Sequence, residues 1–234
     1  MTSIRQRYEK LETERTPFLD RARECSKLTL PTLVPDSGHS ASSKFYTPFQ
    51  GIGARGVNNL ASKLLLALVP PNSPFFRLTV DDFKLQELTQ QEGARAEVEE
   101  ALSSIERAVM SEIESSSVRI ATFEALKHLL VAGNVLLYLP EAEGGMRVFH
   151  MDRYVIKRDP MGNALELITK EDISPETLSP ELQALCDMDQ QEGEVHGYES
   201  VELYTRIVRD GKNWKVNQEL KGKMVPDSEG TYPL

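Results

Sequence analysis

Apolar residues recur at helical spacing in several stretches of the first 132 residues. The clearest stretch runs from about residue 92 to 115, where five apolar residues are spaced by four, three, four and four positions. This spacing places them in one stripe along a helix, with glutamates beside it. The stripe consists of Val98, Leu102, Ile105, Val109 and Ile113. Further helices are predicted over 3–27, 50–69 and 118–132.

Proline, serine and glycine mark the ends and interruptions of these helices. Pro17 lies inside the first helix and predicts a kink or a division into two shorter helices. A proline cluster that begins at Pro70 stops the second helix. Ser117 can cap the helix that follows it, and Gly133 can close that helix in the left-handed conformation. The residues of this helix that we expect to point inward are Phe123, Leu126, Leu129 and Leu130.

Strand-like sequence dominates the second half of the chain. Residues 75–80 are rich in β-forming side chains and predict a strand. The run 135–139 is fully apolar, which predicts a central strand buried on both faces. Asp159–Asn163 and Asp210-Gly211 have the composition of hairpin turns. The other predicted elements are strands over 147–150, 154–158, 165–169, 201–208 and 214–220, a short helix over 174–185 and a polar loop over 190–197.

The order of these elements indicates the fold class. Helices come first and antiparallel strands later, with little βαβ alternation, which is typical of an α+β fold. We therefore expect N-terminal amphipathic helices packed with a mostly antiparallel sheet. A turn-rich stretch over 28–50 suggests a division into an N-terminal helix with an irregular arm, 1–50, and an α+β domain, 51–234.

The charge balance limits the classes of partner. The 234 residues carry 27 Lys and Arg against 36 Asp and Glu, a net charge of −9, which argues against an adhesive nucleic-acid binder. The charge is uneven, with a net of +4 over residues 1–70, −6 over 71–150 and −7 over 151–234. A basic N-terminal third suggests a surface for an anionic partner, although charge alone favours a solvated mixed-charge helix.

Cysteine content and hydropathy exclude other classes. Cys25 and Cys186 cannot form a disulfide framework, and neither lies in a metal-binding motif. The first residues are charged throughout, so no signal peptide is predicted. The longest apolar run, Leu64–Val69, has six residues, against the roughly 20 that span a bilayer. We expect a reduced protein without a membrane segment.

One glycine-rich segment matches a known phosphate-binding pattern. Gly51–Gly56 fits GxGxxG and opens a helix, but a dinucleotide site also needs a buried strand before the loop. The preceding residues are short, polar and broken by Pro48. We therefore interpret the small residues as sites of close packing, which leaves Arg55 and Lys63 free to meet a charged neighbour.

Catalytic constellations are missing from the sequence. The histidines His39, His128, His150 and His196 are dispersed, and no pair has metal-ligand spacing. The glutamates between residues 97 and 114 lie on the polar side of a predicted helix, which favours a solvated face over a paired-carboxylate site. We predict no catalytic, cofactor or metal site, and no enzymatic activity.

Four blocks of sequence, taken together and in order, resemble one family. The blocks are Gly53–Leu64 (GARGVNNLASKL), Phe123–Glu141 (FEALKHLLVAGNVLLYLPE), Tyr154–Asp159 (YVIKRD) with Gly162-Asn163, and Asp227–Pro233 (DSEGTYP). They are similar to the portal proteins, or head-to-tail connectors, of short-tailed podovirus and Autographivirus-type bacteriophages. The regions 70–74 and 178–198 look divergent.

The resemblance implies a structural role in the virion. It implies a subunit of a homododecameric ring at one capsid vertex, assembled in the host cytoplasm, through which double-stranded DNA passes without specific binding. The implied partners are other copies of the chain, capsid and scaffold proteins, terminase and tail adaptors, and no membrane. The chain would form the N-terminal wing region, with stem, clip and crown beyond residue 234. Within it, we expect the subunit interface to include Gly53, Arg55, Gly56, Asn58, Asn59 and Lys63.

Two alternatives of other classes stay open at this point. The first is an interaction module that binds an anionic partner through residues 1–70. The second is an enzyme that uses a nucleotide at Gly51–Gly56.

Overall fold

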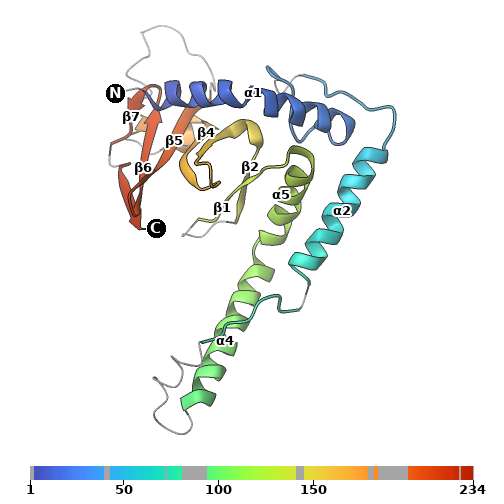
Figure 1. Ribbon diagram of the computed structural model, residues 1–234, viewed down its shortest axis with the longest axis vertical. Helices are drawn as coiled ribbons and strands as arrows, with labels where there is room; N and C mark the ends of the chain where they lie inside the picture. The colour runs from blue at the N-terminus through green and yellow to red at the C-terminus, as the bar shows by residue number, and fades with distance from the viewer. Residues whose placement is uncertain are drawn as a thin grey trace. The chain divides into compact units, whose positions relative to one another are not determined.

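A computed structural model describes residues 3–39, 43–71, 73–80, 94–140, 145–178, 182–183, 200–226 and 228–233. The chain forms two compact units, one of Met1–Glu24 with Phe149–Leu234 and one of Cys25–Val148. The predicted division into 1–50 and 51–234 concerns functional domains and stays a prediction. Both units contain helix and strand, and the α+β class is confirmed (Figure 1).

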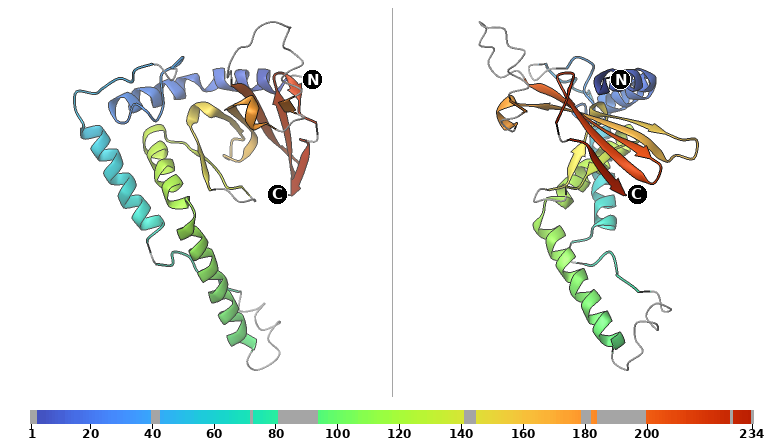
Figure 2. Two further views of the ribbon diagram at one scale, coloured as in Figure 1. Left: turned by 180° about the vertical axis from the view of Figure 1, so that it is seen from behind. Right: turned by 90° about the vertical axis from the view of Figure 1, so that its left-hand side faces the viewer.

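The unit Cys25–Val148 is mostly helical. Two of its helices, α2 and α5, pack side by side, and α4 leads directly into α5 (Figures 1 and 2). Gly133 caps α5 in the predicted left-handed conformation, with φ of 72° and its N–H donated to Leu129 O. The helices are α2 (Ile52–Leu68), α4 (Ala94–Ser115) and α5 (Val118–Ala132), and a two-stranded sheet joins β1 (Leu136–Tyr138) to β2 (Arg147–Phe149).

The other unit is an antiparallel sheet with a helix across it. The sheet order is β3-β4-β5-β6-β7, and β8 also pairs with β6. The strands are β3 (Tyr154–Arg158), β4 (Ala164–Ile173), β5 (Val201–Asp210), β6 (Asn213–Leu220), β7 (Lys223–Met224) and β8 (Gly230–Pro233). Short 3₁₀ turns occur at Met151–Arg153 and Pro175–Thr177.

Turn chemistry sets the two predicted hairpins. Between β3 and β4, the Asp159 carboxylate accepts hydrogen bonds from both the backbone and the side-chain nitrogen of Asn163, at 2.8 and 2.9 Å. Gly162 follows with φ of 89°, a conformation that favours glycine. Between β5 and β6, Gly211 has φ of 63° and Asp210 pairs with Asn213. Both hairpin predictions are confirmed.

Helix α1 (Ile4–Leu28) packs its N-terminal half on one face of the sheet (Figure 2). Val155, Ile168 and Tyr204 lie on that face because Val155 pairs with Ile168 and Tyr204 pairs with Lys170, two residues along β4. From the helix, residues spaced by four and three positions complete the core. These helical residues are Ile4, Tyr8 and Leu11.

A buried carboxylate on the same sheet face ties α1 to two strands. The Glu166 side chain on β4 accepts hydrogen bonds from Arg7 at 2.6 Å and from Arg206 at 2.8 Å. Burial opposes ionisation of Glu166, but the hydrogen bonds from the two guanidinium groups outweigh it, and the pKa of the carboxyl lies below its usual range. The ion pair fixes α1 across β4 and β5.

A second buried carboxylate caps the start of α1. Glu219 on β6 is 2% exposed, and its oxygens accept hydrogen bonds from the Ile4 N–H and the Ser3 hydroxyl, each at 2.5 Å. The Arg5 N–H donates to it at 3.3 Å. Backbone N–H groups at a helix start have no partner within the helix, and a negative charge there also meets the positive end of the helix dipole.

The predicted division of the first helix does not occur, whereas the kink at Pro17 stays a prediction. α1 is one helix through Pro17, because proline removes a single backbone bond while buried residues on both sides, Leu11 and Leu19, hold the helix in place. Two further predictions about these elements are wrong. Residues 75–80 form no strand, and the Leu78 N–H donates to Glu106 Oε1 at 2.6 Å instead of to a neighbouring strand. Ser117 does occupy the N-cap position of α5, but its side chain makes no capping hydrogen bond to a described residue.

Predictions of burial made from apolar sequence are also wrong at two places. β1 is an edge of a two-stranded sheet rather than a central strand, and Leu139 beside it is 69% exposed. In α5, the inward position of Leu126 is confirmed, whereas Leu129 is 46% exposed and Phe123 and Leu130 are half-buried. The buried residues of α5 are Ala121, Ala125, Leu126, His128 and Val131. Of the predicted helix over 174–185, the structure describes the 3₁₀ turn at Pro175–Thr177 and two helical residues, 182–183, and the predicted loop over 190–197 lies outside the described residues.

Candidate functional site

The outward face of α2 combines apolar and basic side chains at the surface. Six of its residues line a shallow depression of about 340 Å³. They fall on one side of the helix because they are spaced by three or four positions, apart from two neighbouring pairs. Ile52 is 74% exposed and Leu60 is 47% exposed. The lining residues are Ile52, Arg55, Gly56, Asn59, Leu60 and Lys63.

The same face continues toward the end of the helix. Leu66, one turn beyond Lys63, is 55% exposed. We call Leu66 and the six residues of the depression the outer face of α2. Arg55 and Lys63 form no ion pair with any residue that the structure describes, and α2 contains no acidic residue. Monomeric proteins rarely leave such a contiguous apolar surface bare unless it binds something.

The opposite side of α2 is tightly packed. Ala61 is fully buried where α2 packs on α5. A Cβ added at Gly53 would lie 2.3 Å from the Leu28 carbonyl oxygen, so only glycine permits this approach of two backbones. The predicted role of small residues in close packing is therefore confirmed at Gly53. It does not extend to Gly56, where a Cβ would meet no heavy atom within 4 Å.

The structure brings together four of the six residues predicted for a subunit interface. Arg55, Gly56, Asn59 and Lys63 share the depression. Gly53 contacts Leu28 of the same chain, and Asn58 is exposed but does not line the depression. The subunit-interface role of all six stays a prediction.

The apolar residues of the outer face were not predicted from the sequence. Ile52, Leu60 and Leu66 have no charge or motif to single them out. A signal for Leu66 does exist, because Leu64, Leu65 and Leu66 are consecutive and successive helical residues point about 100° apart. They cannot all face one partner helix.

The surroundings of Gly51–Gly56 lack part of what a dinucleotide site requires. Residues 43–50 contain no strand, and Gly53 is occupied by its contact with Leu28. A Rossmann-type loop needs a strand before it and open space above its glycines for the phosphates. Of the glycines in this pattern, Gly53 therefore serves close packing within this unit.

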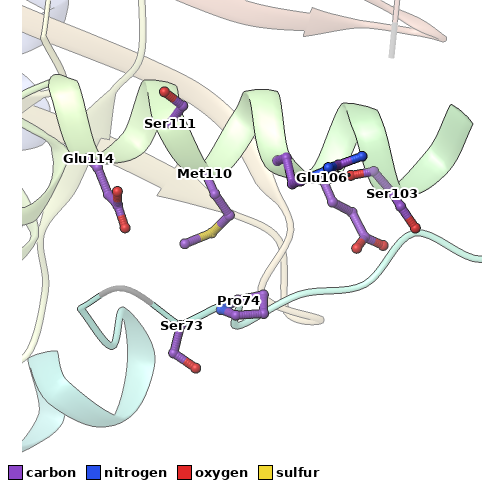
Figure 3. A pocket seen from close by; sticks show the side chains of 8 residues that line it. Ser73, Pro74, Ser103, Glu106, Met110, Ser111 and Glu114 are labelled. Carbon is purple, nitrogen blue, oxygen red and sulfur yellow. Dashed lines mark hydrogen bonds between the residues drawn. The ribbon is translucent and has the colours of Figure 1, made fainter. Parts of the chain in front are cut away.

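A second surface depression, of about 480 Å³, lies between residues 73–74 and α4 (Figure 3). Its two carboxylates, Glu106 and Glu114, are eight residues apart on the helix, or about 12 Å along its axis. Glu106 already accepts the Leu78 N–H. The two groups are too far apart for paired acid–base catalysis. Its lining residues are Ser73, Pro74, Ser103, Glu106, Arg107, Met110, Ser111 and Glu114.

The predicted apolar stripe of α4 exists, and two of its five residues are exposed while the other three are half-buried. Ile105 is 51% exposed and Val109 is 39% exposed. We call Val98, Leu102, Ile105, Val109 and Ile113 the outer stripe of α4. The helix has six glutamates and two arginines, a net charge of −4, whereas α2 has a net charge of +2. This unit thus presents two helix surfaces of opposite charge.

Comparison with known proteins decides the family. Residues 1–232 match the family model described as bacteriophage head to tail connecting protein. The chain belongs to this family. It is 41% identical to the portal protein of Escherichia phage T7 over 232 residues, which is 97% of the chain and 43% of that relative. It is 37% identical to the portal protein of Enterobacteria phage T3, over 97% of the chain and 43% of the relative. It is 32% identical to that of Enterobacteria phage SP6, over 90% of the chain and 41% of the relative.

The head to tail connecting family match extends through both compact units, although the chain spans less than half the length of these relatives. The block Gly53–Leu64 forms most of α2 and carries its outer face. The block that starts at Phe123 forms most of α5 and β1. The resemblance to portal proteins stated from these blocks is confirmed.

Three of the four histidines lie within the residues that the structure describes. His39 stacks on Phe45 with ring centroids 4.1 Å apart, and His128 is 1% exposed in α5. His150 follows β2, and His196 lies outside the described residues. Among the described helices, none is both long and apolar enough to cross a membrane.

Proposed function

We propose that this chain is part of a bacteriophage portal subunit, a structural protein of the ring that joins head to tail. The observation that carries the proposal is the match of residues 1–232 to the head to tail connecting family, together with relatives named portal protein. The bare outer face of α2 supports it, because a ring subunit must present a surface to its neighbour.

The finer assignments follow from the family. The chain would form the wing region of a homododecamer at one capsid vertex, within the virion, after assembly in the host cytoplasm. Its partners would be its own copies, capsid and scaffold proteins, terminase and tail adaptors. The protein would hydrolyse no nucleotide and hold no cofactor, because terminase supplies the energy for packaging.

A net charge of −9 suits a protein through which DNA passes. An acidic wall repels phosphate, so it favours sliding over adhesion. Double-stranded DNA would then be a cargo rather than a ligand, and its passage would depend little on sequence.

The alternative, a module that binds an anionic partner through residues 1–70, has less support. Five of the ten basic residues of this region form ion pairs within the chain. Ion pairing reduces the positive field that such a partner would meet. The paired residues are Arg5, Arg7, Arg15, Arg23 and Lys27.

Imaging tests the proposal directly. The product of the complete reading frame is purified and examined by negative-stain electron microscopy, with the 234-residue chain alongside it. We expect ring-shaped particles with twelvefold symmetry from the complete product. A complete product that stays monomeric and ringless over the usable concentration range contradicts the proposal.

The six predicted interface residues are part of this proposal. Gly53, Arg55, Gly56, Asn58, Asn59 and Lys63 would position or form the contact between neighbouring subunits. Arg55→Glu should impair ring formation, and the fraction of particles in rings measures the effect. Normal rings from Arg55→Glu would refute the role of Arg55.

A further inference from the structure

We propose that the outer face of α2 in one copy docks on the outer stripe of α4 in the next copy. This inference rests on the proposed function, since it presumes that the chain assembles with itself. Beyond the proposed function, it names the two surfaces that meet. It also predicts that each contact joins a different face of each of the two copies.

The two surfaces match in length. The outer face of α2 runs from Ile52 to Leu66, 14 positions further along the helix, which is about 21 Å. The outer stripe of α4 runs from Val98 to Ile113, 15 positions further along, which is about 22 Å. Helices pack by laying the ridge of one into the groove of the other over such lengths.

The shapes of the α2 and α4 surfaces are also complementary. Gly56 is one of the residues that line the depression of about 340 Å³ on α2, and a Cβ at this position would meet no heavy atom within 4 Å. On α4, Ile105 and Val109 project with 51% and 39% of their area exposed. A branched aliphatic side chain seated over a glycine is the usual means of bringing two helices close together.

Their charges are opposite. Arg55 and Lys63 stand on the outer face of α2, with no ion-pair partner among the described residues. Helical geometry places Glu99 at one flank of the outer stripe of α4 and Glu112 at the other. Docking therefore brings the two cations beside a ridge with carboxylates on both sides, which gives specificity as well as attraction.

The same charges oppose contacts between two identical surfaces, α2 with α2 or α4 with α4. Two α2 faces would oppose four cations, and two α4 stripes would oppose carboxylates. Pairing α2 of one copy with α4 of the next leaves the first copy with a free α4 stripe and the second with a free α2 face. A repeated contact of this type generates a closed ring or an open helical filament. A ring is the outcome that the proposed function requires.

Charge exchange between the two surfaces tests the inference in the complete product. Variant A carries Arg55→Glu and Lys63→Glu, and variant B carries Glu99→Lys and Glu112→Lys. Each should associate at least about tenfold more weakly than wild type in sedimentation velocity, because attraction becomes repulsion at two positions. Combining all four substitutions in one chain should restore association, and so should mixing A with B, in rings whose subunits alternate.

Two controls match these charge changes. Glu97→Lys with Glu100→Lys alters the same helix on the side away from its outer stripe. Lys157→Glu with Lys212→Glu reverses two exposed cations in the other unit. Both control variants should associate like wild type, and circular dichroism confirms that every variant is folded.

The outcomes separate this inference from the proposed function. Rings from wild type, with no recovery in either the fourfold variant or the A and B mixture, overturn the inference and leave the portal assignment standing. Recovery of association without closed rings upholds the paired surfaces and contradicts the portal assignment. A wild-type protein that never associates overturns both.

Discussion

The two compact units treat their polar and apolar surfaces in opposite ways. On the sheet of the first unit, Glu166 and Glu219 are buried and hydrogen-bonded to α1. In the helical unit, Ile52 and Ile105 remain more than half exposed. These two carboxylates of the first unit find their partners within the chain, whereas the α2 and α4 faces of the second unit leave apolar side chains exposed. Mutations should therefore affect folding in the first unit and assembly at the helix faces of the second.

The largest effect on stability should come from Glu166→Gln. Loss of the carboxylate leaves Arg7 and Arg206 facing each other, and breaking a buried ion pair is costly, here about 3 kcal/mol of unfolding free energy. Urea denaturation measures this loss of unfolding free energy. The exposed Glu176→Gln serves as the control and should change stability by less than about 0.5 kcal/mol. Equal stability of the two variants would show that the ion pair does not hold α1 on the sheet.

Two glycines of α2 should behave in opposite ways. Gly53→Ala forces a methyl group against the Leu28 carbonyl and should cost about 2 kcal/mol. Gly56→Ala meets no atom within 4 Å and should stabilise the helix by about 0.5–1 kcal/mol. Thermal unfolding of the two variants at a concentration where the chain is monomeric checks this. Equal stability of the Gly53→Ala and Gly56→Ala variants would contradict the tight contact between Gly53 and Leu28.

Gly56→Ala also separates folding from assembly. Because its methyl group projects from the outer face of α2, this variant should associate more weakly despite its greater stability. Sedimentation equilibrium beside the unfolding curve gives both quantities. Stability and association that rise together would place Gly56 outside the contact.

A smaller effect is expected from Glu219→Ala. It removes the acceptor of hydrogen bonds from Ser3, Ile4 and Arg5 at the start of α1, which should cost about 1.5 kcal/mol. Amide hydrogen exchange should show faster opening of the first turn of α1. Glu14→Gln, an exposed carboxylate in the same helix, provides the comparison and should leave that turn unchanged.

Acid should reduce the stabilising effect of Glu166. Its pKa is lower in the folded chain than the ordinary value of about 4.3, so its ionised form adds stability above that pH. This stability is lost as the pH falls through the folded pKa, where the protonated carboxyl resembles glutamine. The stability difference between wild type and Glu166→Gln should therefore shrink below pH about 4. A difference that is constant down to pH 3 contradicts the lowered pKa.

Local chemistry made much of the fold predictable. The hairpin turns at Asp159–Asn163 and Asp210-Gly211 depend on residues next to one another, and so does the Gly133 cap. Burial was less predictable. The apolar run at β1 indicates only a preference for apolar surroundings, and it cannot tell whether the chain itself supplies them.

Contacts between residues far apart in the chain could not be predicted from the sequence. Glu219 caps a helix that begins 215 residues earlier, and Glu166 joins residues from α1 and β5. A weak signal existed in β4, where Glu166 shares a strand face with Ile168 and so falls on a side that a helix covers. At the candidate interface, charge singled out Arg55 and Lys63, while the only local sign of the exposed apolar residues beside them was the run of three leucines that ends at Leu66.

Solvent access to the outer face of α2 tests the central claim most directly. In a chain with Cys25→Ser and Cys186→Ser, Asn59→Cys places one thiol on that face, and Lys212→Cys places one in the exposed hairpin of the other unit. Labelling rates with a thiol reagent are compared between assembled and monomeric protein. We predict at least about tenfold protection of Cys at position 59 on assembly, with no comparable change at position 212. Equal labelling of position 59 in the assembled and monomeric protein would contradict the claim that this face is the contact between subunits.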